Sequence, residues 1–131
     1  MAVRLVHEPA TGEDDRTLAA RVEVADSVLA RARGLMFRRS VPDGYALAFP
    51  FDRVATRRLH MLFVPVAIDA VWTVAGEVRR VDRLAAWTGL GSAAADRVYE
   101  LPAGAADGVA PGDRLRLEGD GADGQSPRGV D

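Results

Sequence analysis

The chain of 131 residues contains no cysteine, no lysine and no asparagine. Without cysteine there is no disulfide, no thiolate metal site and no thiol nucleophile. Without lysine, Schiff-base chemistry and the P-loop that needs a lysine are excluded. Without asparagine there is no acceptor for N-glycosylation. These absences remove several enzyme classes, and they leave arginine as the source of all 17 basic side chains.

The sequence also lacks a hydrophobic segment of membrane-spanning length. The most apolar stretch, residues 61–74, is shorter than a spanning helix and contains Asp69. Acidic residues near the N-terminus stand where a signal peptide would have its apolar run. We therefore expect a cytoplasmic protein without a membrane partner.

The composition that remains is typical of one small folded domain. Hydrophobic residues make up 48% of the chain and charged residues 27%, which suffices for a core and a solvated surface. The net charge of -2 gives no general attraction to nucleic acid, so we expect no nucleic-acid partner. Residues 119–131 are rich in glycine and aspartate and predict a disordered polar tail after a domain formed by residues 1–118.

Short alternating segments predict a mainly β fold. Asp26 or Ser27 should cap one short helix that ends at Gly34, and Ala75-Gly76 should form the turn of a β-hairpin. Residues 52–56 and 85–95 are expected to be irregular. The predicted fold class is α+β, mainly β, with a compact barrel-like antiparallel sheet and one short helix in the N-terminal half. The expected strands cover residues 4–7, 18–24, 45–51, 58–64, 68–74, 77–84, 97–101 and 114–118.

Four short motifs follow one another in a fixed order. They are RGLMFR at residues 33–38, HMLFV at 60–64, IDAVW at 68–72 followed by Gly76, and YELPAG at 99–104 followed by Gly112-Asp113. Together they resemble the domain of unknown function 192, also called uncharacterised protein family 0127, over roughly residues 22–117. The resemblance implies a compact, mainly β domain and brings no assigned reaction. The motif that begins at His60 is similar to the archaeal form.

Asp69 is the most unusual polar residue because apolar residues flank it on both sides. A buried carboxylate needs N–H donors or an opposite charge, or its pKa rises. In one interpretation Asp69 accepts backbone N–H groups and fixes a turn. In the other, Asp69 orients the imidazole of His60, which then serves as an acid or base. For His60 the simpler alternative is an imidazole bonded to a backbone carbonyl.

The predicted ligand-binding site consists of His60, Asp69, Trp72, Arg58 and Trp87. The guanidinium of Arg58 suits a carboxylate or phosphate, and Trp87 lies in a glycine-rich stretch that suits a pocket wall. No catalytic residue is assigned and no cofactor is expected. With only two histidines and no cysteine in the chain, we expect no metal site.

Three functions remain open at this point. The leading hypothesis is a module that binds a small molecule or a partner protein in a pocket near His60, Asp69 and Trp72. The first alternative is a hydrolase or isomerase in which His60 and Asp69 form an acid–base pair, although the sequence shows no complete catalytic set. The second is a purely structural interaction domain, which predicts an exposed apolar patch around residues 84–90.

Overall fold

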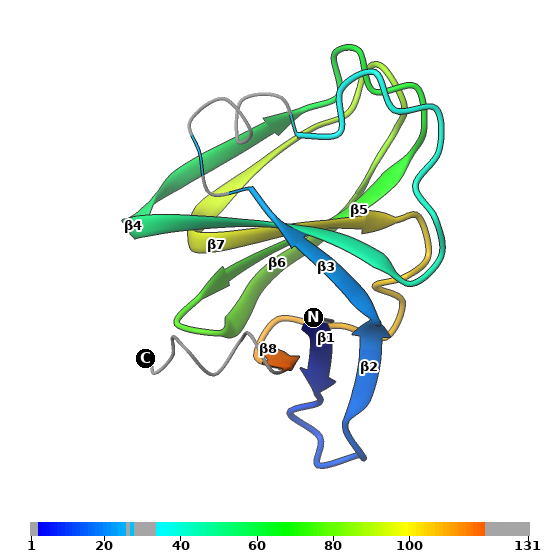
Figure 1. Cartoon of the computed structure of the whole chain (residues 1–131). Coiled ribbons are helices and arrows are strands. Elements are labelled where there is room, and N and C mark those ends of the chain that lie inside the picture. The colour runs from blue at the N-terminus through cyan, green and yellow to red at the C-terminus, as the bar shows by residue number, and fades with distance from the viewer. Residues whose placement is uncertain (1–2, 26, 28–33, 120–131) are drawn as a thin grey trace.

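The described part of the chain consists of β-strands joined by turns. The computed structural model describes residues 3–25, 27 and 34–119. Figure 1 shows a strongly curved sheet in which the long strands β4 and β7 lie side by side. The mainly β class predicted from the sequence is confirmed. The strands are β1 (Val3–Glu8), β2 (Arg16–Ala19), β3 (Arg21–Val24), β4 (Tyr45–His60), β5 (Ile68–Val74), β6 (Glu77–Leu84), β7 (Leu90–Pro102) and β8 (Arg114–Gly119).

Two predicted features fall mostly outside these residues. The short helix expected from Asp26 or Ser27 to Gly34 covers residues 28–33, which are not described, and residues 3–25, 27 and 34–119 contain no helix. The tail predicted from residue 119 is likewise outside the description, except for its first residue. Gly119 ends β8 and pairs with Val3.

The sheet is open, and the predicted barrel-like closure is wrong for the described residues. The strand order is β2-β1-β8-β6-β5-β7-β4-β3, with β2 and β3 at the two edges. Only Ala20 separates these edge strands, whereas a hairpin needs a loop of at least about two residues. They therefore run on as one bent segment instead of pairing. The all-antiparallel prediction also fails at β3, which pairs with β4 in parallel.

The β5–β6 hairpin is confirmed where it was predicted. Val74 pairs with Glu77 across the turn. Ala75 and Gly76 have φ values of 50° and 85°. Positive φ at both central residues is the geometry of a type I′ turn, whose twist matches that of the flanking strands.

Strand β4 is longer than predicted and sharply bent. The expected loop at 52–56 is part of the strand, and the strand expected at 58–64 ends at His60. Both halves of β4 pair with β7, and the register shifts between Pro50 and Ala55. Pro50 has no N–H to donate to the ladder, which suits a bulge. Because β4 bends while it pairs with a single strand, its two halves form facing walls of a pocket.

Buried apolar side chains fill both sides of the central strands. On β5, Ile68, Ala70 and Trp72 belong to one core cluster, and Val71 belongs to a second. This division follows the alternation of side chains along a strand. The first cluster lies beside the bend of β4 and shares residues with the lining of a pocket there.

Candidate functional site

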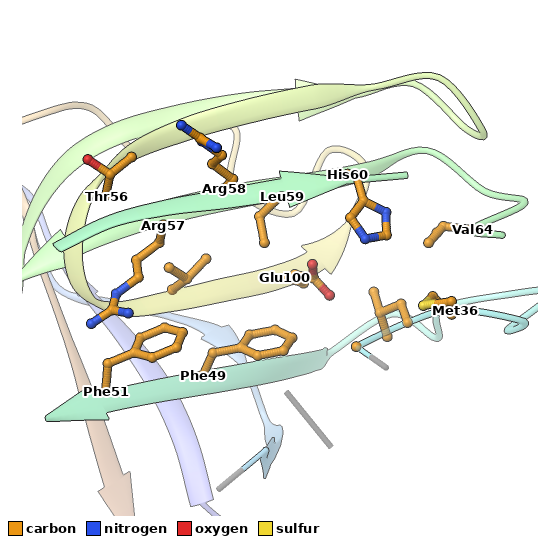
Figure 2. Close-up of a pocket in the computed structure, with 13 residues that line it drawn as sticks. Met36, Phe49, Phe51, Thr56, Arg57, Arg58, Leu59, His60, Val64 and Glu100 are labelled. Carbon is orange, nitrogen blue, oxygen red and sulfur yellow. The ribbon is translucent and has the colours of Figure 1, made fainter. Parts of the chain in front are cut away.

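A pocket of about 360 Å³ lies at the bend of β4. The first half of β4 contributes two aromatic walls, and the second half contributes polar and basic groups. Figure 2 shows Phe49 and Phe51 facing Arg57 and Leu59 across the hollow, with Glu100 of β7 between the two halves of β4. Residues 34–36 and Val64 close one end. The lining residues are Gly34, Leu35, Met36, Phe49, Phe51, Thr56, Arg57, Arg58, Leu59, His60, Val64, Val98 and Glu100.

Glu100 is the chemically distinctive group in this pocket. It is only 6% exposed, and its Oε1 is buried without a hydrogen-bond partner in the described part of the chain. Burial raises the pKa of Glu100 to about 7, against a smaller opposing effect from the charge of Arg38. A carboxyl oxygen of this kind is ready to bond an incoming donor. Sequence reasoning missed it, although a glutamate between Tyr99 and Leu101 in a predicted strand carries the same signal as Asp69.

Gly34 leaves room beside that carboxyl group. A Cβ at this position would lie 3.4 Å from Cζ of Phe49 and 3.5 Å from Oε1 of Glu100. The φ of Gly34 is 51°, a backbone conformation that residues other than glycine rarely adopt. A larger residue here would therefore occupy part of the hollow next to Glu100 and strain the turn.

His60 is the predicted site residue that the structure places beside Glu100. It ends β4, its side chain is exposed, and Figure 2 shows its imidazole directed toward the hollow that Glu100 occupies. Its Nδ1 accepts a hydrogen bond from the backbone N–H of Leu62 at 3.2 Å. This bond fixes the ring at the mouth of the pocket.

The two arginines of the lining differ in their freedom. The guanidinium of Arg57 lies 3.9 Å above the ring of Phe51, and it donates to the carbonyl oxygens of Ala95 at 3.2 Å and Arg53 at 2.6 Å. Arg58 is exposed, and Figure 2 shows its guanidinium pointing away from Glu100. Thus neither cation neutralises the buried carboxyl group.

Asp69 is held elsewhere, so the predicted His60–Asp69 pair is not formed. Oδ2 of Asp69 accepts the backbone N–H groups of Gly104 and Ala106, each at 2.9 Å. The guanidinium of Arg83 donates to Oδ1 at 2.8 Å. Asp69 does not line the pocket. Of the two interpretations offered by the sequence, these contacts match the structural one.

The two tryptophans also lie outside the pocket lining. Trp72 is fully buried in the core, where its Nε1 donates to the carbonyl oxygen of Arg57 at 2.8 Å. Trp87 is 56% exposed on the turn between β6 and β7. The structure therefore brings Arg58 and His60 to the pocket and separates Asp69, Trp72 and Trp87 from it.

The described strands form a small, mainly β domain with an open, curved sheet. The chain belongs to the family DUF192, described as Uncharacterized ACR, whose model matches residues 10–117. The family resemblance seen in the sequence motifs is thereby confirmed.

Two solved structures are similar over most of the chain. A proposed transcription regulator from Sinorhizobium meliloti is 26% identical, with a TM-score of 0.74 over 89% of this chain and 94% of that one. A protein of unknown function from Novosphingobium aromaticivorans is 21% identical, with a TM-score of 0.74 over 88% and 84%. The second likeness shows the fold alone. A comparison with curated proteins gives no match.

Proposed function

We propose that the chain is a small-molecule-binding module whose site is the pocket at the bend of β4. The observation that carries this proposal is the buried Oε1 of Glu100, which lacks a partner in the described residues and faces a hollow with aromatic walls. Small-molecule sites commonly combine an apolar lining with a few convergent polar groups. This proposal keeps His60 and Arg58 of the predicted site and replaces Asp69 with Glu100.

The lining indicates the chemistry of the ligand. Phe49 and Phe51 suit an apolar or aromatic body, and Glu100 suits a hydrogen-bond donor. A protonated amine is the strongest such donor, because an ionised Glu100 would gain an opposite charge in a poorly hydrated place. We therefore propose an apolar amine as the ligand class.

Three matched probes test this proposal. Phenethylamine, phenethyl alcohol and hydrocinnamate share a phenylethyl body and differ in the charge of the head group. At a pH above 7, thermal shift assays should give the largest stabilisation with phenethylamine, and Glu100→Gln should abolish its advantage over the alcohol. Glu77→Gln, which changes a glutamate outside the pocket, should leave that advantage intact. An amine preference that survives Glu100→Gln would refute the proposed anchor.

A hydrolase or isomerase remains the second candidate. The observation that favours it is a carboxyl group with a pKa near 7 in the same pocket as His60. In this version Glu100 takes the role that the sequence analysis gave to Asp69. We favour binding because a catalytic imidazole is normally oriented by a carboxylate or carbonyl acceptor. Here Nδ1 of His60 instead accepts a backbone N–H.

Nucleic acid is not part of the proposed function. The neighbour from Sinorhizobium meliloti is described as a proposed transcription regulator. A net charge of -2 provides no general attraction to phosphates, so we do not extend DNA binding to this chain. Its cytoplasmic location and archaeal origin stay predictions.

A further inference from the structure

Five large hydrophobic side chains are exposed on the turns next to the pocket and at the start of β7. We call this surface the aromatic tip. Phe37 is 63% exposed, Leu62 54%, Phe63 43%, Trp87 56% and Leu90 75%. They belong to three segments that lie far apart in the sequence and come together at one end of the molecule, at the top of Figure 1. Clustered exposed apolar residues on a small domain mark an interaction surface.

Backbone hydrogen bonds fasten these turns to one another. The N–H of Phe37 donates to the carbonyl oxygen of Phe63 at 2.6 Å, and the N–H of Trp87 donates to that of Val64 at 3.0 Å. The rings of Phe37 and Phe63 are stacked, with centroids 5.3 Å apart. The tip is therefore a defined structure and not a set of independent side chains.

The backbone of the tip is unusual as well. Among the described residues, four other than glycine have a positive φ, and three of these are Phe37, Phe63 and Trp87, at 68°, 61° and 67°. Bulky side chains seldom adopt this conformation, and such outliers cluster at functional sites. Here the conformation is found at the three exposed aromatic residues of the tip.

The charge of this end differs from that of the whole molecule. Residues 34–41, 58–66 and 84–91, which carry the tip, contain Arg38, Arg39 and Arg58 but no aspartate or glutamate, although the chain has a net charge of -2. Arg38 reaches Glu23 at 3.4 Å, whereas Arg39 is exposed and makes no ion pair within the described ranges. The segments that carry the tip therefore have basic side chains and no acidic ones, and Glu23 pairs with one of the three arginines.

We propose that the aromatic tip docks the protein onto an anionic lipid surface. Tryptophan favours the membrane interface, exposed phenylalanine and leucine enter its apolar side, and neighbouring arginines are attracted to anionic headgroups. The tip consists of turns that join different strands and of the first residue of β7, and these segments lie together at one end of the sheet. The expectation of no membrane partner rested on overall charge and apolar length, and neither describes this local surface.

Docking in this orientation would also bring the pocket to the membrane. Met36 and Val64 line the pocket and directly adjoin Phe37 and Phe63 in the sequence. Lipid docking requires no ligand in the pocket, so vesicles alone can test it.

The intrinsic fluorescence of Trp87 gives a direct test. The chain has two tryptophans, and Trp72 is fully buried, so a change on adding vesicles reports Trp87. With vesicles of equal parts phosphatidylcholine and phosphatidylglycerol, we expect a blue-shifted emission and co-sedimentation of the full chain. Vesicles of phosphatidylcholine alone should bind about tenfold more weakly, because the arginine attraction is then lost.

Paired variants locate the docking surface. Phe37→Asn together with Phe63→Asn should lower vesicle binding at least about tenfold, while asparagine tolerates the positive φ at both positions. Val54→Ser, which removes a 49% exposed side chain of β4, should bind like the original protein. Binding that the double variant retains would overturn the proposal, as would a failure to bind anionic vesicles. Sedimentation velocity showing a dimer that the double variant abolishes would also overturn it, by making the tip a contact between two copies.

Discussion

At the scale of single residues, Asp69 connects strand β5 to the turns that follow β7. Its Oδ2 accepts backbone amides that lie 35 and 37 residues further along the chain, and its Oδ1 accepts the side chain of Arg83. Buried N–H groups are costly to leave unbonded. Asp69 thereby fixes the path of residues 103–107, and its burial has a structural cause.

Replacing Asp69 with asparagine should therefore destabilise the fold. We expect Asp69→Asn to lower the free energy of unfolding by about 2–4 kcal/mol, because the amide group offers one acceptor oxygen in place of two and cannot pair with Arg83. Urea denaturation measures this loss. Asp107→Asn is the matched control, since Asp107 is exposed and pairs only at the surface with the same arginine; it should cost less than about 1 kcal/mol. Equal effects of the two variants would contradict this role of Asp69.

Glu100 contrasts with Asp69 although both are carboxyl groups on central strands. Asp69 meets N–H donors on both oxygens, whereas Oε1 of Glu100 has no donor in the described residues. Of these two carboxyl groups, Glu100 is therefore the one with an oxygen available to accept a hydrogen bond from a ligand. The difference depends on which backbone segment passes each side chain.

At the scale of elements, the pairing of β4 with β7 builds the pocket. Beyond the register shift, where β7 pairs with the second half of β4, β7 passes close to the core at Gly91. A Cβ on Gly91 would lie 2.8 Å from Cη2 of the buried Trp72 ring. That ring is also held by its hydrogen bond to β4, so it cannot move aside freely. The small residue thus lets the second half of β4, β7 and the indole pack together.

A methyl group at this position should disturb the packing of β7 against Trp72. Gly91→Ala is expected to cost about 1–3 kcal/mol of unfolding free energy through overpacking. The neighbouring Ser92→Ala should change it by less than about 0.5 kcal/mol, because the hydrogen bond from Arg80 uses the backbone oxygen of Ser92. Thermal unfolding followed by circular dichroism compares the two. The idea fails if Gly91→Ala is as stable as Ser92→Ala.

At the scale of the whole molecule, the buried Glu100 makes stability depend on pH. Its folded pKa of about 7 lies above the ordinary value of 4.5, so between these values the folded state binds more protons than the unfolded one. The stabilisation that comes from keeping Glu100 protonated in the folded state is complete below pH 4.5. This stabilisation is lost as the pH rises to about 7. The fold therefore bears the full penalty of an ionised Glu100 in alkaline solution, unless a ligand supplies a positive charge.

Glu100→Gln removes this penalty while keeping the side-chain shape. We expect the variant to be more stable than the original protein by up to about 3 kcal/mol at pH 8, and nearly equal to it at pH 4. Denaturant titrations at a series of pH values measure the difference in unfolding free energy between the two proteins. The other titrating groups are present in both proteins, so their contributions cancel in this difference. A difference that does not change with pH would show that Glu100 keeps an ordinary pKa.

Local features were predicted well and long-range ones poorly. The hairpin turn at Ala75-Gly76 follows from two adjacent residues, and the sequence identified it. The bend of β4 could not be foreseen, because residues 52–54 resemble a loop until β7 is present to pair on either side of them. The sequence singled out His60 as a polar group on an apolar segment, and the structure places it in the pocket lining; its neighbour Glu100 was not singled out.

The sequence by itself determined the chemistry available to this protein: no thiol, no amine side chain, arginine as the only strong base, and a few carboxyl groups among apolar neighbours. Only the tertiary structure decided which carboxyl oxygen has no hydrogen-bond donor among the described residues. Burial and hydrogen-bond supply are set by segments distant along the chain, such as the amides of Gly104 and Ala106 that reach Asp69. Nothing within a few residues of Asp69 or Glu100 reveals this difference in hydrogen bonding. The difference is the reason why the candidate site is placed at Glu100 and not at Asp69.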